Sequence, residues 1–204
     1  MEPEPTIHHI YNRGAHKAPI FLDRSDYERM LMLLYIANCS EPFVLRKINE
    51  QRVFEVKRKD TLVDIVCYCL MPNHIHIAVK QRPRLCISQF MHKLCTGYSG
   101  YFNRKNIHSG TIWQGPYKEK FADDLEYGGT LINYIHLNPY FGIKEPDLTR
   151  ESRPEHLQRA IKYSREYEFS SFKDYLGEIR PQTAILCSAE ARPLRKAQRP
   201  RLCD

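Results

Sequence analysis

The sequence lacks a long apolar run, since its longest nearly apolar stretch, residues 30–39, spans only ten residues. A membrane-spanning helix needs about 20 apolar residues, so this pattern excludes a transmembrane protein. The N-terminal residues also lack the basic start and apolar stretch of a secretory signal, and we therefore expect a cytoplasmic protein with reduced cysteines. Two of its seven cysteines, Cys67 and Cys69, share a strand face but lack the second pair of a zinc site, so they are interpreted as buried thiols.

The composition is not that of a disordered chain, because 42% of the 204 residues are hydrophobic and 27% are charged. These proportions exclude disorder throughout and support one folded core. Lysine and arginine number 31 against 24 aspartate and glutamate residues, which gives a net charge of +7. This excess favours a polyanionic partner, although a soluble basic protein without such a partner has the same balance.

The C-terminal segment has few apolar residues, three prolines and an excess of positive charge. From position 180 onward its acidic residues are Glu190 and Asp204. Its basic residues are Arg180, Arg192, Arg195, Lys196, Arg199 and Arg201. We therefore predict a folded domain over residues 1–180 and a flexible basic arm over residues 181–204 that contacts nucleic acid.

Hydrophobic periodicity predicts the order of the secondary-structure elements. Strands are predicted at residues 6–12, 61–70, 74–80 and 117–122, and helices at residues 25–38, 86–103 and 123–137. An inserted β-hairpin is predicted at residues 43–57, and weaker helices near residues 154–163 and 172–176. Ser25 is the expected cap of the first helix, and Pro139 is the expected end of the third.

The order strand, helix, strand, strand, helix, strand predicts an α+β fold. It is that of a ferredoxin-like (split βαβ) antiparallel sheet with both helices on one face, here with an additional helix over residues 123–137. The other face of such a sheet is open, and many proteins use it to bind single-stranded nucleic acid. A fold alone does not assign a function, so the site must be argued from side chains.

The first candidate site residues are His74 and His76. Side chains on a strand alternate between faces, so these two imidazoles point the same way while Ile75 and Ile77 point to the core. Two imidazoles on one face can supply two ligands to a divalent ion. Alone, the pattern is more often a pair of ordinary half-exposed strand residues.

A second pair, Tyr134 and Asn138, shares one face of the predicted helix because the two residues are four positions apart. The Asn138 amide oxygen could then be a third metal ligand. His136 is two positions from Tyr134 and faces elsewhere. A helical tyrosine is usually core packing and Asn before Pro usually ends a helix, so this pair is also weak evidence alone.

Five short motifs together carry a resemblance to a known family. They are His8-x-x-Tyr11-Asn12-Arg13-Gly14, Cys69-Leu70-Met71-Pro72-Asn73-His74-Ile75-His76, Ser109-Gly110-x-x-Trp113-Gln114-Gly115, Tyr134-Ile135-His136-Leu137-Asn138-Pro139 and Ser170-Ser171-Phe172-x-x-Tyr175. With these motifs in order over residues 6–178, the chain resembles the REP-associated tyrosine transposases of the HUH single-tyrosine superfamily. The 43–57 insertion, the residues after Asn138-Pro139 and the C-terminal arm depart from the family pattern.

The resemblance implies a metal-dependent endonuclease and strand transferase acting on single-stranded or hairpin DNA. Its nucleophile is then Tyr134, which forms a 5′-phosphotyrosine, and its metal ligands are His74, His76 and Asn138. The implied metal is Mg²⁺ or Mn²⁺, although ligand softness alone also allows Zn²⁺. The implied protein is a monomer or a homodimer, associated with the nucleoid in a bacterium. A domesticated protein that binds hairpins without cutting them is the alternative.

Four further side chains outside the arm are candidates for DNA contact. Arg13 belongs to the first motif, and Trp113 lies in a turn-rich loop where it could stack on a base, although a lone tryptophan more often anchors a loop. Arg104 and Lys105 follow aromatic residues on one helix and could bind phosphates. At the C-terminal end of that helix they also interact favourably with its dipole.

Overall fold

The structure is a computed structural model that describes residues 7–43, 48–81, 87–122, 125–148 and 154–187. Four strands form its sheet: β1 (Ile7–Arg13), β2 (Val63–Met71), β3 (His74–Gln81) and β4 (Lys118–Ala122). The larger helices are α1 (Arg24–Ile36), α2 (Ile87–Lys105), α3 (Leu125–Pro139) and α4 (Leu157–Glu166), and α5 (Phe172–Tyr175) is a single turn. No described helix is both long and apolar enough to cross a membrane.

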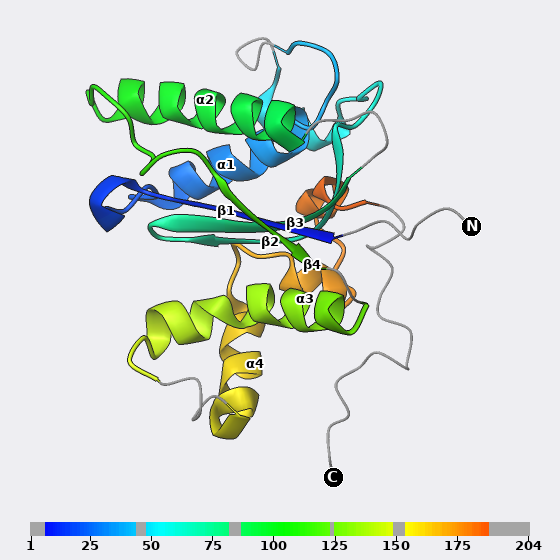
Figure 1. Ribbon diagram of the computed structural model, residues 1–204. Helices are drawn as coiled ribbons and strands as arrows, with labels where there is room; N and C mark the ends of the chain where they lie inside the picture. Colours follow the sequence, from blue (N-terminus) through cyan, green and yellow to red (C-terminus); the bar gives the residue numbers. More distant parts are fainter. Residues whose placement is uncertain (1–6, 44–47, 82–86, 123–124, 149–153, 188–204) are drawn as a thin grey trace.

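The sheet is antiparallel throughout and has the strand order β2-β3-β1-β4. Helices α1 and α2 cover one face, and α3 and α4 lie on the other (Figure 1). The predicted order of strands and helices is therefore confirmed, as is the antiparallel α+β sheet. The second face is not fully open, because α3 packs on it, mainly against β2.

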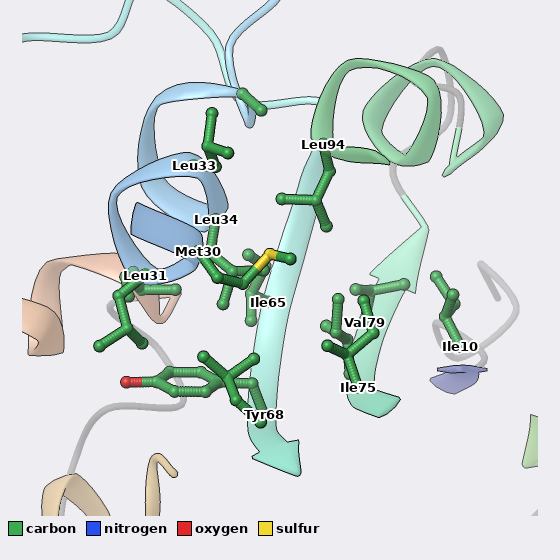
Figure 2. Packing of buried hydrophobic residues seen from close by; sticks show 14 of the residues in the cluster. Ile10, Met30, Leu31, Leu33, Leu34, Ile65, Tyr68, Ile75, Val79 and Leu94 are labelled. Atoms are coloured by element: carbon green, nitrogen blue, oxygen red, sulfur yellow. The ribbon is translucent and has the colours of Figure 1, made fainter. Parts of the chain in front are cut away.

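The core lies between the sheet and the helices α1 and α2, as Figure 2 shows. The strands contribute alternate residues to it, among them Ile10, Ile75 and Ile77, which are completely buried. Leu34 from α1 and Leu94 from α2 are equally buried opposite them. Strand β2 is buried on both faces, and its free thiols Cys67 and Cys69 are inaccessible, as expected.

Two local predictions in the first half of the chain were wrong. The cap of α1 is Asp23 rather than Ser25, because the Asp23 carboxylate accepts from the Ser25 amide at 2.9 Å while Asp26 accepts from the Asp23 amide. Of the predicted 43–57 hairpin, residues 44–47 lie outside the described residues, and none of its described residues is in a strand. Its residues Glu50–Glu55 form a 3₁₀ helix, η3, because Asn49 caps the first turn, Val53 is buried and Phe54 packs against the core.

The end of α3 also differs from the prediction. Pro139 lies inside the helix, and the chain continues as a π-helical turn, η4 (Tyr140–Lys144). A proline removes one amide donor and clashes with the turn before it, so it leaves the residues after it free to continue in a helical turn. Burial of Tyr140 and its hydrogen bond to His156, 3.1 Å from hydroxyl to Nδ1, hold that turn in place.

The folded part of the chain extends past the predicted boundary at residue 181. Residues Pro181–Ile185 form a 3₁₀ helix, η6, and both Ile185 and Leu186 are buried. The amide of Cys187 donates to the carbonyl of Ile65 at 2.9 Å, so this segment is part of the fold. Arg180 is ion-paired with Asp174 at 2.6 Å and is not a free basic residue. Residues 188–204, with the remaining basic positions, lie outside the described residues.

Candidate active site

A cleft of about 690 Å³ opens on the α3 face of the sheet. Strands β1, β3 and β4 form its floor, and α3 forms one wall. The described residues that line it are His9, Tyr11, Asn12, Arg13, Asn73, His74, His76, Gln114, Gly115, Pro116, Lys118, Lys120, Tyr134, Asn138 and Gly142. Three of these are basic and none is acidic, so the cleft suits an anionic ligand.

Strand register brings the two predicted histidines together on the cleft floor. His76 pairs with Tyr11 and His74 with Arg13 across the β1–β3 ladder. Their rings are 4.9 Å apart, centroid to centroid, and perpendicular. Both side chains point away from the α1/α2 core, as predicted, but His76 is only 6% exposed because α3 and neighbouring side chains cover it. The alternative interpretation of the pair, two ordinary half-exposed strand residues, therefore does not hold for His76.

The tight turn between β2 and β3 fixes the orientation of His74. The Asn73 side-chain amide nitrogen donates to the Lys17 carbonyl at 3.0 Å, which turns its Oδ1 toward His74. That oxygen lies 2.6 Å from His74 Nδ1 and can only accept, so Nδ1 carries the proton and Nε2 keeps its lone pair. Gly14 is required beside this turn, because a Cβ there would lie 2.2 Å from the Ala18 carbonyl oxygen.

A third histidine, His9, joins the site and was not predicted. Its Nε2 lies 2.9 Å from His76 Nδ1, and the two rings stack with centroids 5.1 Å apart. The signal was present in the sequence, because His9 and Tyr11 alternate with Ile10 as His74 and His76 alternate with Ile75. Recognising it required the β1–β3 register, which joins residues 67 positions apart.

Burial holds these three imidazoles in the neutral form. It lowers the pKa of His9 to about 4, with a smaller effect from the positive charge of Lys120. It also lowers the pKa of His74 to about 4, where Arg13 adds to the effect. The pKa of His76 is well below its ordinary value, first through burial and then through the neighbouring histidines and Arg13. Neutral imidazole is the form that coordinates metals.

Tyr134 and Asn138 reach the cleft from α3, on one face of the helix as predicted. The Tyr134 side chain is 44% exposed, and its ring centroid lies 5.8 Å from that of His76 and 5.9 Å from that of His9. The Asn138 amide nitrogen donates to the Tyr134 carbonyl at 3.2 Å. His136 faces the interior instead, where its Nε2 lies 2.9 Å from the Ser171 hydroxyl, so it is not a site residue.

The donor set of the cleft fits a divalent metal ion of the predicted kind. Among the described residues, no three His, Cys, Asp or Glu side chains are grouped to hold a metal. The candidate set is therefore two imidazoles and one amide. His74 has a free Nε2 lone pair, and His76 has one when its Nδ1 proton is donated to His9. Such partners of the second ring nitrogen are the usual way in which proteins orient metal-binding histidines.

The predicted DNA-contacting residues are not all at this site. Arg13 lines the cleft. Trp113 is only 6% exposed and its indole nitrogen donates to the Ser99 hydroxyl at 3.0 Å, so it anchors a loop and is not displayed for stacking. Arg104 and Lys105 lie at the end of α2, on the opposite face of the sheet (Figure 1). Lys105 is held there by Asp26 at 2.6 Å.

Two lysines that the sequence analysis missed, Lys118 and Lys120, line the cleft from β4. They pair with Tyr11 and His9 in the β1–β4 ladder and therefore share their face. Their alternation with Glu119, whose Oε1 lies 2.5 Å from His8 Nδ1 on the other face, could have revealed them. Together with Arg13, they give the cleft its positive charge.

Comparison with known proteins finds a matching family model and solved structures of similar fold. Residues 41–138 match the family described as "Transposase IS200 like". A solved structure described as a REP-associated tyrosine transposase bound to a REP hairpin has a similar fold, with a TM-score of 0.52 and 13% identity over 87% of this chain and 84% of that one. No curated protein matches the chain.

Proposed function

We propose that this chain, whose residues 41–138 match the IS200-like transposase family, is a single-strand-specific DNA endonuclease and strand transferase. Tyr134 is the nucleophile in this proposal, and His74, His76 and Asn138 are the residues that hold the metal ion. The substrate is single-stranded DNA next to a hairpin. The related structure was determined with a REP hairpin bound, which supports this class of substrate.

The observation that carries the proposal is the meeting of Tyr134 with the two histidines. The histidines come from β3 and the tyrosine from α3, almost 60 positions later in the chain. The rings of Tyr134 and His76 are nevertheless 5.8 Å apart across a cleft with a basic lining. Because Tyr134 is 44% exposed, its hydroxyl is open to a large substrate.

In the proposed reaction, the Tyr134 oxygen attacks the phosphorus of one phosphodiester. A bond forms between this oxygen and phosphorus while the bond from phosphorus to the 3′-oxygen breaks, and the 3′-oxygen takes up a proton. The products are a 5′-phosphotyrosine and a strand with a free 3′-hydroxyl. One phosphodiester replaces another, so a 3′-hydroxyl can reverse the step and join strands without ATP.

A divalent ion bound by the two imidazoles would polarise the scissile phosphate and favour loss of the phenol proton. Mg²⁺ and Mn²⁺ suit a site with an amide ligand and room for phosphate and water. The other residues of the cleft orient the metal-binding histidines and bind the DNA. Asn73 and His9 orient His74 and His76 through the hydrogen bonds described above, and Arg13, Lys118 and Lys120 attract the DNA backbone.

The experiment that tests the proposal uses 3′-labelled single-stranded hairpin oligonucleotides with randomised flanks and Mn²⁺. The downstream fragment keeps the label and becomes linked to the protein, so a denaturing gel shows a labelled covalent adduct. Metal chelation and the substitution Tyr134→Phe should both abolish it. Hairpin binding without any adduct would instead support the alternative, a hairpin-binding protein without cleavage activity.

The basic residues beyond the described fold have a separate role in this proposal. Five of them, Arg192, Arg195, Lys196, Arg199 and Arg201, make nonspecific contacts with phosphates. For single strands, each phosphate neutralised contributes about −0.7 to the slope of log affinity against log salt. Deleting residues 188–204 while keeping the folded segment 181–187 should flatten that slope and leave cleavage at saturating DNA intact. An unchanged slope would assign the segment to another partner.

A further inference from the structure

A second cavity, which we call the side pocket, lies between α3 and the start of α4 and has a volume of about 310 Å³. Its described lining residues are Thr130, Asn133, Tyr134, Leu137, Asn138, Phe141, Pro154 and Leu157. Two of them, Tyr134 and Asn138, also line the cleft of the candidate active site. The two cavities are therefore neighbours that share one wall.

The shape of the side pocket is set by the unexpected continuation of α3. Because the chain continues through Pro139 into the π-helical turn η4, Phe141 follows Asn138 along the same wall. Tyr140 fastens this turn to the opposite wall through its hydrogen bond with His156 and a ring contact with Tyr163, with centroids 6.0 Å apart. These contacts hold the pocket open as a built feature of the fold.

The lining of the side pocket suits a flat, neutral group with a polar edge. Leu137, Phe141, Pro154 and Leu157 provide apolar walls, while Thr130 and Asn133 add a hydroxyl and an amide. None of its described lining residues is charged, so it does not suit a phosphate. Leu157, which is 41% exposed, is accessible to a ligand from solvent. A nucleobase has apolar faces and hydrogen-bonding edges, which match this lining.

We propose that the side pocket binds the base of one unpaired nucleotide adjacent to the phosphate that Tyr134 attacks. This assignment rests on the proposed function, because it takes its occupant from the strand in the neighbouring cleft. The shared wall is the reason for choosing a base over a peptide or a second copy of the chain. Because Tyr134 lines both cavities, a strand whose phosphate lies at its hydroxyl can extend its next base into the side pocket. The side pocket then discriminates among nucleotides at the cleavage position.

The test compares equilibrium binding of two labelled probes, a short oligothymidylate and an abasic strand of equal length, to the full chain with metal chelated. Wild-type protein should bind the oligothymidylate more tightly than the abasic strand. Leu157→Ser should weaken oligothymidylate binding by roughly five- to tenfold, within the range for loss of one base contact, and change abasic binding less than about twofold. Leu176→Ser is the matched control, because Leu176 is 42% exposed but lies outside both cavities.

Equal weakening of both probes by Leu157→Ser, or equal wild-type affinity for the two, would overturn the assignment. A change in the sedimentation of DNA-free protein on Leu157→Ser would identify a second copy of the chain as the occupant and would also overturn it. This binding test is independent of the proposed cleavage activity, because binding is measured with the metal chelated. If no covalent adduct forms but Leu157→Ser still weakens binding of the oligothymidylate alone, the proposed cleavage activity is rejected and the assignment of the side pocket stands. If the adduct forms but Leu157→Ser does not discriminate between the two probes, the cleavage proposal stands and the assignment of the side pocket is rejected.

Discussion

The two faces of the sheet are made by the same strands yet differ in almost every physical property. On the face toward α1 and α2, Ile10, Ile75 and Ile77 are completely buried among aliphatic side chains. On the face toward α3, the adjacent residues His9 and His76 meet around a cationic cleft. Because side chains alternate along a strand, each strand can supply stability on one side and chemistry on the other.

The difference disappears at β2, and this locates the site. Helix α3 packs mainly on β2, so that strand is buried on both faces, with Cys67, Cys69 and Met71 inaccessible. The floor formed by β3, β1 and β4 is left beside the helix, where Tyr134 overhangs it. The site therefore lies beside the main contact between α3 and β2, where only side chains of α3 reach over the floor, and substitutions on the two faces should separate activity from stability.

The largest expected contrast is between two tyrosine hydroxyls. Tyr134→Phe should abolish the covalent adduct and change the free energy of unfolding by less than about 0.5 kcal/mol, because that side chain is 44% exposed. Tyr98→Phe is the matched change on the other face, where the hydroxyl donates to the Ile20 carbonyl at 2.5 Å. It should cost about 1–3 kcal/mol and keep the adduct. Adduct formation by Tyr134→Phe would place the nucleophile elsewhere.

The next contrast uses neighbours on one strand. Ile77→Ala should cost about 2–5 kcal/mol in urea denaturation, because it leaves a cavity in the core. His76→Ala should abolish metal-dependent cleavage and cost about 1–3 kcal/mol, since His9 then loses its buried partner. His74→Ala should abolish cleavage as well but cost less stability, because His74 is more exposed than His76. Metal-dependent cleavage that survives in both His74→Ala and His76→Ala would make these histidines structural.

The sequence predicted the elements whose signal is local and repeated. The alternation in β1, β2 and β3 and the helical spacing of Phe90, Met91, Leu94 and Tyr98 in α2 are each confirmed within one to three residues. Predictions failed where one local signal was ambiguous. The adjacent apolar residues Val53 and Phe54 fit a 3₁₀ helix as well as a strand, and a proline conflicts with the turn before it rather than with the residues after it.

The candidate site was predicted in part for the same reason. His74 with His76, and Tyr134 with Asn138, are each pairs within one element, so their shared faces follow from the sequence. The position of His9 beside His76 and of Lys120 beside His9 depends on strand register between distant segments. Trp113 illustrates the opposite case, since nothing local distinguishes a displayed indole from one buried against Ser99.

A smaller effect is expected from the residue that orients His74. Asn73→Ala removes the acceptor for His74 Nδ1, so the Mn²⁺ concentration needed for half-maximal cleavage should rise about 10- to 100-fold, while excess Mn²⁺ restores the rate. Asn38→Ala is the control near the core, where that side chain bonds the backbone of Leu62 and Val63. It should lower the unfolding free energy without changing the Mn²⁺ requirement. Equal Mn²⁺ requirements in Asn73→Ala and wild type would remove Asn73 from the site.

The smallest effect is expected from replacing one glycine in α2, which packs on the core face of the sheet, and one in α3, which lies on the face that carries the site. A Cβ built at Gly129 meets nothing within 4 Å, so Gly129→Ala should raise the free energy of unfolding by about 0.5–1 kcal/mol through helix propensity alone. A Cβ at Gly97 would lie 3.1 Å from Leu33 Cδ2 on α1, so crowding should cancel or reverse the same gain. Urea denaturation of both variants measures the difference. Equal stabilisation would mean that Leu33 yields freely and that the α1–α2 side is packed no more tightly than the side that carries the site.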